Sequence, residues 1–314
     1  MHRASGVMLA IAAFVFVPAV DAQEAGRIRV ITDVTVEGLA GRRWLAMLRQ
    51  RLPDSSYQAL AHLARPLGDR ERRWEALIRA RSESWEHEIA GLAETYAPVH
   101  APDLALVVLG NRGGEDAFVH DGTTIGFDLA ALNASYGDPD EPENLARIDR
   151  FFRHEYVHLL QKAWLARLPA PGARPLDLAI MDMWSEGLGN YYSLSPRWRA
   201  PDGSLTSHAK AALERLEPRL VVRLAALACA SPAGGVRLAS DLSTGPFAEK
   251  WGALPTALWL AAEEAESEGA LRRLVLAGPD GVWALAERRL APALRAVLME
   301  IRAAAARCDP PARR

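Results

Sequence analysis

The chain has 314 residues, of which 50% are hydrophobic and 24% are charged. This composition is typical of a globular protein, and it excludes an intrinsically disordered chain and a collagen-like or low-complexity fibre. The 37 basic and 39 acidic residues give a formal net charge of -2, so the charge balance does not favour nucleic acid or an anionic membrane as a partner.

The first 22 residues have the three-part pattern of a secretory signal peptide. Arg3 supplies a positive charge, an apolar run from Val7 to Val20 follows, and Val20 and Ala22 are small residues at the -3 and -1 positions of a cleavage site. The run is shorter than the roughly 20 residues of a membrane-spanning helix. We therefore predict a signal peptide over 1–22, export to the periplasm or the medium, and no stable membrane span after cleavage.

Strands are expected before residue 130. The β-branched segment 27–36 and the apolar run 103–109 each predict a strand, and Asp121-Gly122 between two β-prone segments predicts a hairpin over 117–129. Helical periodicity marks 41–52 and 70–97. Arg-Arg-Trp clusters in these two segments are balanced by glutamates, which indicates a solvated helix face and not a nucleic-acid site.

Helices dominate after residue 130. A long helix is expected over 143–168 and a second over 175–194, which has proline at its first position. Further helical stretches are expected near 207–229, 246–268, 269–277 and 280–306. Together these elements predict an α+β fold. A lobe over 23–168 holds a small β-sheet and the long helix, and a mainly helical C-terminal lobe spans 169–314.

Cys229 and Cys308 are the two cysteines of the chain. Two cysteines are too few for a disulfide-rich scaffold, and the sequence leaves open whether they are separate buried thiols or one disulfide. An exported protein meets oxidising surroundings, which favour the disulfide.

The long predicted helix contains His154-Glu155-Tyr156-Val157-His158, which is the pattern H-E-x-x-H. Residues i and i+4 lie on one helix face, so the two imidazoles can converge on one zinc ion at about 2.0–2.1 Å each. Glu155 lies beside such a metal without binding it, and it can take a proton from the water that the metal activates. We interpret the motif as a zinc site.

A catalytic zinc site takes a third protein ligand and keeps a fourth position open. Glu186, 28 positions after the second histidine, lies on the next predicted helix, and an antiparallel helix pair would place it opposite both imidazoles. Gly187 and Gly189 would let the two helices approach closely. Asp182, one turn earlier, is the competing ligand, and Asn190, one turn later, is a candidate to orient a ligand histidine.

H-E-x-x-H followed on the next helix by Glu-Gly-Leu-Gly-x-Tyr resembles the gluzincin metallopeptidases, the clan of thermolysin and aminopeptidase N, over roughly residues 104–195. The resemblance implies that His154, His158 and Glu186 bind zinc and that Glu155 is the general base. It also implies that the hairpin before the long helix supplies an edge strand that receives the substrate backbone.

The chain also departs from this clan. It lacks a G-A-M-E-N-like segment, with which aminopeptidase N relatives hold a free amino terminus, so the sequence does not support exopeptidase action. No residue stands out as the one that stabilises the oxyanion. The candidates for that role are Tyr136, Arg153, Tyr191, Tyr192 and His208.

These features predict zinc-dependent hydrolysis of peptide bonds in a peptide or protein substrate, with Zn2+ as the cofactor and no nucleic-acid partner. The alternative is a non-catalytic zinc-binding scaffold, or an envelope binding protein, with a gluzincin-like fold. A third hypothesis is a helical envelope protein in which the motif is accidental and no zinc binds.

Overall fold

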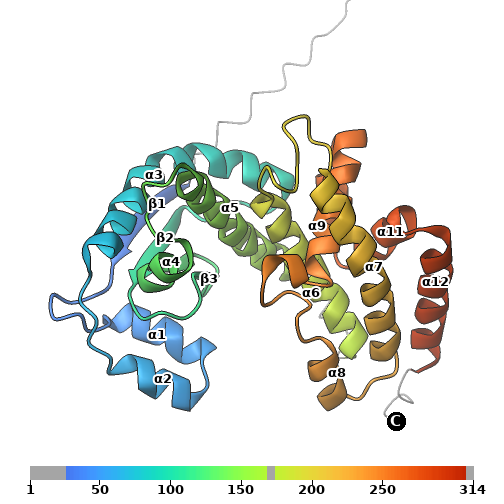
Figure 1. Ribbon diagram of the computed structural model, residues 1–314, viewed down its shortest axis with the longest axis horizontal. Helices are drawn as coiled ribbons and strands as arrows, with labels where there is room; N and C mark the ends of the chain where they lie inside the picture. The colour runs from blue at the N-terminus through green and yellow to red at the C-terminus, as the bar shows by residue number, and fades with distance from the viewer. Residues whose placement is uncertain (1–25, 168–173, 309–314) are drawn as a thin grey trace, which may run out of the picture.

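The computed structural model describes residues 26–167 and 174–308, and its fold is α+β as the sequence predicts (Figure 1). One four-stranded sheet and twelve α-helices lie within these residues. The expected signal peptide over 1–22 and the expected lobe boundary between 168 and 169 fall outside the described residues.

The sheet has the strand order β1-β2-β4-β3. Strands β1 (Arg27–Thr32), β2 (Leu104–Gly110) and β4 (Thr124–Asp128) are parallel, and β3 (Ala117–Val119) pairs antiparallel with β4 at the edge. The predicted hairpin is therefore confirmed. Strand β1 is shorter than the expected segment 27–36, because its parallel pairing with β2 ends at Thr32 and Val34 forms an isolated antiparallel bridge with Ala40 instead.

Helices cover both faces of the sheet. Parallel strands need a long crossover, and the one between β1 and β2 consists of α1 (Arg42–Arg51), α2 (Asp54–Ala61) and α3 (Asp69–Thr95). Helix α1 buries Trp44 and Met47 in a small cluster on one face, whereas the tryptophans of α3 join the large core on the other face. Helix α4 (Leu129–Tyr136) follows β4 directly, and the Asp128 carboxylate caps it by accepting a hydrogen bond from the Ala131 amide.

Two long helices link the sheet to the C-terminal half. Helices α5 (Pro142–Leu165) and α6 (Pro175–Ser193) confirm the two expected helices. Contacts between them run in opposite sequence directions: Gln161 of α5 donates a hydrogen bond to the Ser185 carbonyl, and His154 of α5 meets Ser193 of α6. The pair is therefore antiparallel, as the third-ligand hypothesis requires.

The C-terminal half is mainly helical in its described part, with three departures from expectation. Helix α8 (Pro232–Leu238) was not expected. The stretch 280–306 is two helices, because Pro292 begins a new helix. Proline is tolerated at the first helical position, since an N–H group there would have no acceptor within the helix. The stretch 246–268 becomes α-helical only at Ala253, after a short 3-10 turn at Phe247–Glu249. The helices here are α7 (Ser207–Leu227), α8 (Pro232–Leu238), α9 (Ala253–Glu266), α10 (Ala270–Ala277), α11 (Asp280–Arg289) and α12 (Pro292–Arg307).

One large hydrophobic core extends through both halves of the chain. It includes buried side chains of α3 and the sheet, passes through α5 and α6, and continues to α12. Trp184 of α6 shows the depth of this packing, because its indole is buried and donates a hydrogen bond to the Leu274 carbonyl of α10 at 3.1 Å. None of the described helices combines the length with the hydropathy of a membrane-spanning segment.

Cys229 and Cys308 form a disulfide, which settles the pairing that the sequence left open. The bond joins the chain just after α7 to the end of α12, across a sequence separation of 79 residues. A cross-link over a long loop stabilises a protein mainly by restricting its unfolded state.

We expect the Cys229→Ser/Cys308→Ser double variant to lose about 2–4 kcal/mol of unfolding free energy, because the unfolded chain regains the entropy that the cross-link removes. Urea unfolding of the oxidised protein and the variant measures this difference. Reductant should destabilise the wild-type protein and leave the double variant unchanged. Equal midpoints for the oxidised and the reduced wild-type protein would contradict the prediction.

Candidate metal centre

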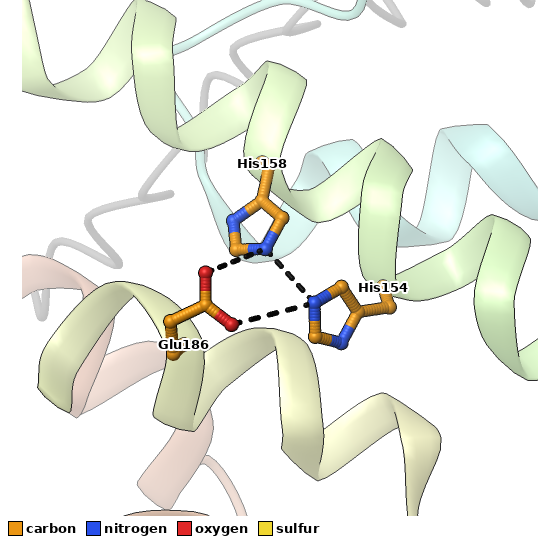
Figure 2. A group of neighbouring side chains, drawn as sticks. All are labelled: His154, His158 and Glu186. Atoms are coloured by element: carbon orange, nitrogen blue, oxygen red, sulfur yellow. Dashed lines mark hydrogen bonds and ion pairs between the residues drawn. The ribbon is translucent and has the colours of Figure 1, made fainter. Parts of the chain in front are cut away.

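Two imidazoles of α5 and one carboxylate of α6 converge where these helices pack together (Figure 2). The Nε2 atoms of His154 and His158 lie 3.0 Å apart. The Glu186 carboxylate lies 3.5 Å from His158 Nε2 through one oxygen and 3.7 Å from His154 Nε2 through the other. The structure thus brings together the three side chains that the sequence singled out as metal ligands.

Helix geometry and one glycine create this arrangement. His154 and His158 are one turn apart on α5 and so point to the same side. Gly189 of α6 lies directly against the His154 ring: a Cβ atom there would be 2.8 Å from Cε1 of the imidazole. Gly187 faces α9 and not α5: a Cβ atom at this position would be 2.5 Å from Cγ2 of Thr256. Gly189 alone of these two glycines therefore allows the close approach of α6 to α5 that the sequence predicted for both.

Hydrogen bonds at the far side of each imidazole orient the two rings. His158 Nδ1 lies 2.6 Å from the Gln161 side-chain oxygen, and Gln161 is held in turn by the Ser185 carbonyl and hydroxyl at 2.9 and 2.8 Å. His154 Nδ1 lies 3.1 Å from the Ser193 hydroxyl. Because Gln161 offers an oxygen, the proton of His158 belongs on Nδ1 and its Nε2 lone pair faces the other two side chains.

The spacing of the three groups fits a tetrahedral zinc ion. Zinc–ligand distances of about 2.0–2.1 Å place neighbouring ligand atoms about 3.3–3.4 Å apart. The observed separations of 3.0, 3.5 and 3.7 Å bracket that value. Two imidazoles and one carboxylate are also a donor set that zinc uses in catalytic sites.

The charge states of His158 and Glu186 suit metal binding, whereas His154 would have to lose a proton to a bound metal. Burial lowers the pKa of His158 to about 4, which keeps this imidazole neutral as a ligand must be. Burial opposes charge on Glu186 as well, but the neighbouring imidazoles outweigh that effect and lower the pKa of the carboxyl to about 2. Burial likewise opposes protonation of His154, yet the Glu186 and Glu155 carboxylates raise its pKa.

Glu155 is a buried residue of α5, and its charge interacts with those of His154 and Glu186. Burial raises the pKa of its carboxyl to about 7, and the charges of Glu186 and Asp116 add to this effect. A carboxyl poised near neutral pH can both accept and return a proton.

Lys250 is a charged neighbour of the cluster that sequence reasoning missed. It lies in the segment between the 3-10 turn and α9, and its positive charge favours the ionised carboxylates of both Glu186 and Asp182. For Asp182 burial outweighs this effect and raises the pKa to about 6. Among the described residues it forms no ion pair. No local sequence signal marks it, because its approach depends on how α9 packs against α6.

Several other candidates have different partners. Asp182, the competing ligand, accepts a hydrogen bond from Ser243 at 2.9 Å and is not part of the three-residue group. The orienting role expected of Asn190 is filled by Gln161 and Ser193, and the Asn190 amide nitrogen is buried without a hydrogen-bond partner among the described residues.

The five candidates for stabilising an oxyanion are engaged elsewhere. Tyr136 donates a hydrogen bond to Asp116 at 2.6 Å, Arg153 forms an ion pair with Glu88, and the ring of His208 packs on Trp198. Tyr191 and Tyr192 lie at the C-terminal end of α6. Within the described ranges, none of the five forms a hydrogen bond or ion pair with the three clustered side chains.

Gly189 and Gly187 offer a matched test of how the site is built. We expect Gly189→Ala to weaken zinc binding about ten-fold, because its Cβ displaces the His154 ring. Gly187→Ala should instead cost about 1–3 kcal/mol of stability by crowding Thr256, with zinc affinity retained. Competition with a chromophoric chelator measures the affinities, and thermal unfolding measures stability. Equal zinc affinities in the two variants would contradict this assignment.

No protein-family model, no curated protein and no solved structure matches the chain.

Proposed function

We propose that the protein is a zinc-dependent peptidase that cleaves peptide bonds with a water molecule as nucleophile. The observation that carries the proposal is the convergence of His154, His158 and Glu186 at metal-ligand spacing. The buried Glu155 carboxyl follows His154 in the sequence and interacts electrostatically with His154 and Glu186. Zinc bound there supplies Lewis acidity, which polarises a carbonyl and makes water acidic enough to lose a proton near neutral pH.

The side chains of the site divide the work of hydrolysis. Gln161 and Ser193 hold the two imidazoles with their Nε2 atoms directed inward. A carboxylate oxygen of Glu155 accepts the proton of the attacking water and later delivers it to the departing amine. Its pKa of about 7 suits both transfers, because the group is neither a strong acid nor permanently charged at neutral pH.

The edge of the sheet offers a place for an extended substrate. Strand β3 pairs with β4 on one side only, and no other described strand pairs with its outer side, where Arg51 donates a hydrogen bond to the Val119 carbonyl. The hairpin is tied to α5, because Lys162 donates a hydrogen bond to the His120 carbonyl at 3.2 Å. An extended peptide added along β3 would run beside the helix that carries Glu155.

We expect the purified wild-type protein to hold a single zinc ion per chain, and Glu186→Ala to lose most of it, because two imidazoles alone give a weaker site. Elemental analysis after dialysis against trace zinc measures the stoichiometry. Glu83→Ala, at an exposed position on α3, is the control and should keep its zinc. A wild-type protein that retains no zinc would support the hypothesis of an accidental motif.

Glu155→Gln should abolish hydrolysis, with a loss of at least about a hundred-fold, because the amide cannot accept the proton from water. Cleavage of casein and of a mixed peptide library measures activity, and zinc content should remain at the wild-type level. Glu83→Gln is the charge-matched control. Full activity of Glu155→Gln contradicts the mechanism, and a zinc-loaded wild-type protein without activity indicates a non-catalytic scaffold.

A further inference from the structure

A cleft of about 960 Å³ lies away from the three clustered side chains, between α3, the N-terminal half of α5 and the end of α6. Arg150 and Arg153 line it from α5, and Tyr191 and Tyr192 line it from α6. Arg199, from the segment after α6, completes this wall. These five residues are referred to below as the arginine–tyrosine cleft.

The acidic residues of the cleft are already paired. Glu88 accepts two hydrogen bonds from Arg153, at 2.7 and 3.0 Å. Asp149 accepts two hydrogen bonds from Arg81 and a third from the Trp85 indole. Their charges are therefore balanced by neighbouring donors, which leaves the remaining arginines to set the character of the cleft.

Arg150 and Arg199 have unused donor capacity. Arg150 is 9% exposed, and its only partner among the described residues is the half-exposed Glu143. Arg199 has no carboxylate partner within the described ranges: it donates to the Tyr191 hydroxyl at 3.1 Å and lies over that ring, 5.1 Å from the centroid. A guanidinium has five N–H donors, so both side chains retain several for a ligand. Arg150 is buried with one carboxylate partner, and the partly buried Arg199 has none among the described residues, so their remaining donors favour an anionic ligand.

Two aromatic rings provide an apolar surface beside these cations. Tyr191 and Tyr192 meet edge to face, with ring centroids 5.2 Å apart. Leu92 and Leu194 extend the apolar lining. A flat hydrophobic group can pack against such a surface while a carboxylate on the same molecule reaches the guanidinium groups.

The cleft is distinct from the metal centre. Arg153 and His154 are adjacent in sequence but about 100° apart around α5, and the first side chain pairs with α3 whereas the second points to α6. The same division holds on α6, where Tyr192 lines the cleft and Ser193 contacts the His154 ring.

We propose that the arginine–tyrosine cleft binds an organic carboxylate with an aromatic body, its carboxylate held by Arg150 and Arg199 and its ring packed on Tyr191 and Tyr192. The site needs no metal and does not rest on peptidase activity. Bidentate hydrogen bonding of a carboxylate by arginine supplies both affinity and orientation.

Binding of N-acetylphenylalanine to the full chain tests this inference, with N-acetylphenylalaninamide as the uncharged probe of the same shape. Titrations followed by NMR use protein treated with a chelator, so that no metal can hold the carboxylate. The acid should bind at least about ten-fold more tightly than the amide, as expected for a charge-assisted hydrogen bond. Gly-Gly-Phe is a third probe, which distinguishes a peptide C-terminus from a small free acid as the ligand. Tighter binding of Gly-Gly-Phe than of N-acetylphenylalanine identifies a peptide C-terminus, and weaker binding identifies a free acid.

Substitutions locate the binding. Arg199→Met and Arg150→Met should each weaken binding of the acid about ten-fold and leave the amide unaffected. Arg199→Lys should retain part of the preference because it keeps the charge but not the planar fork. Arg72→Met, an exposed position at the other end of α3, is the control for net charge. Circular dichroism establishes which variants are folded.

Three results would overturn the inference. One is equal binding of the acid and the amide to the wild-type protein. Another is binding of the acid that persists unchanged in folded Arg199→Met and Arg150→Met. The third is binding of the acid that is lost on chelator treatment and returns with zinc, because the carboxylate would then be bound at the metal centre.

Discussion

The close contact of α5 and α6 is the constraint on which the candidate metal centre depends. Two imidazoles on one helix and one carboxylate on another reach metal-ligand spacing only if the backbones come near each other. Gly189 permits that distance, because any side chain there would occupy the space of the His154 ring. The remaining features of the centre adjust the orientation and charge of groups that this packing has already brought together.

Burying so many polar groups beside a large apolar core requires that most of them have partners. Gln161 meets this need for two helices at once, because it bonds His158 on its own helix and Ser185 on the next. Glu186 lies within 3.5 Å of one imidazole and 3.7 Å of the other, so its negative charge can balance a proton or an ion that the imidazoles hold. The polar cluster is thus part of the packing between helices and not an interruption of it.

Local sequence patterns were sufficient for features that depend on one helix or one turn. The i, i+4 spacing fixed the direction of the two imidazoles, and Asp121-Gly122 marked the hairpin, because both follow from backbone geometry alone. Gln161 could have been found in the same way, since it continues the face of His154 and His158. Pro292 also carried a readable signal for the break between α11 and α12.

Features that depend on tertiary packing could not be read from the sequence. In the sequence, helices α7 and α8 separate Lys250 from α6. Its position near the cluster therefore follows from the packing of α9 on α6. The pairing of Cys229 with Cys308 likewise depends on how α12 returns to the end of α7. The arginine–tyrosine cleft draws on three separate segments, none of which has a recognisable motif.

The placement of the ligand groups on successive helices has a mechanical consequence. An ion shared by His158 and Glu186 would close a loop of the intervening chain, 28 positions from one residue to the other, in the manner of a cross-link. Unfolding either helix would then require releasing the ion, so the free energy of ion binding would add to that of folding. The same three side chains would act as a reversible clasp between the sheet-bearing half and the helical half of the molecule.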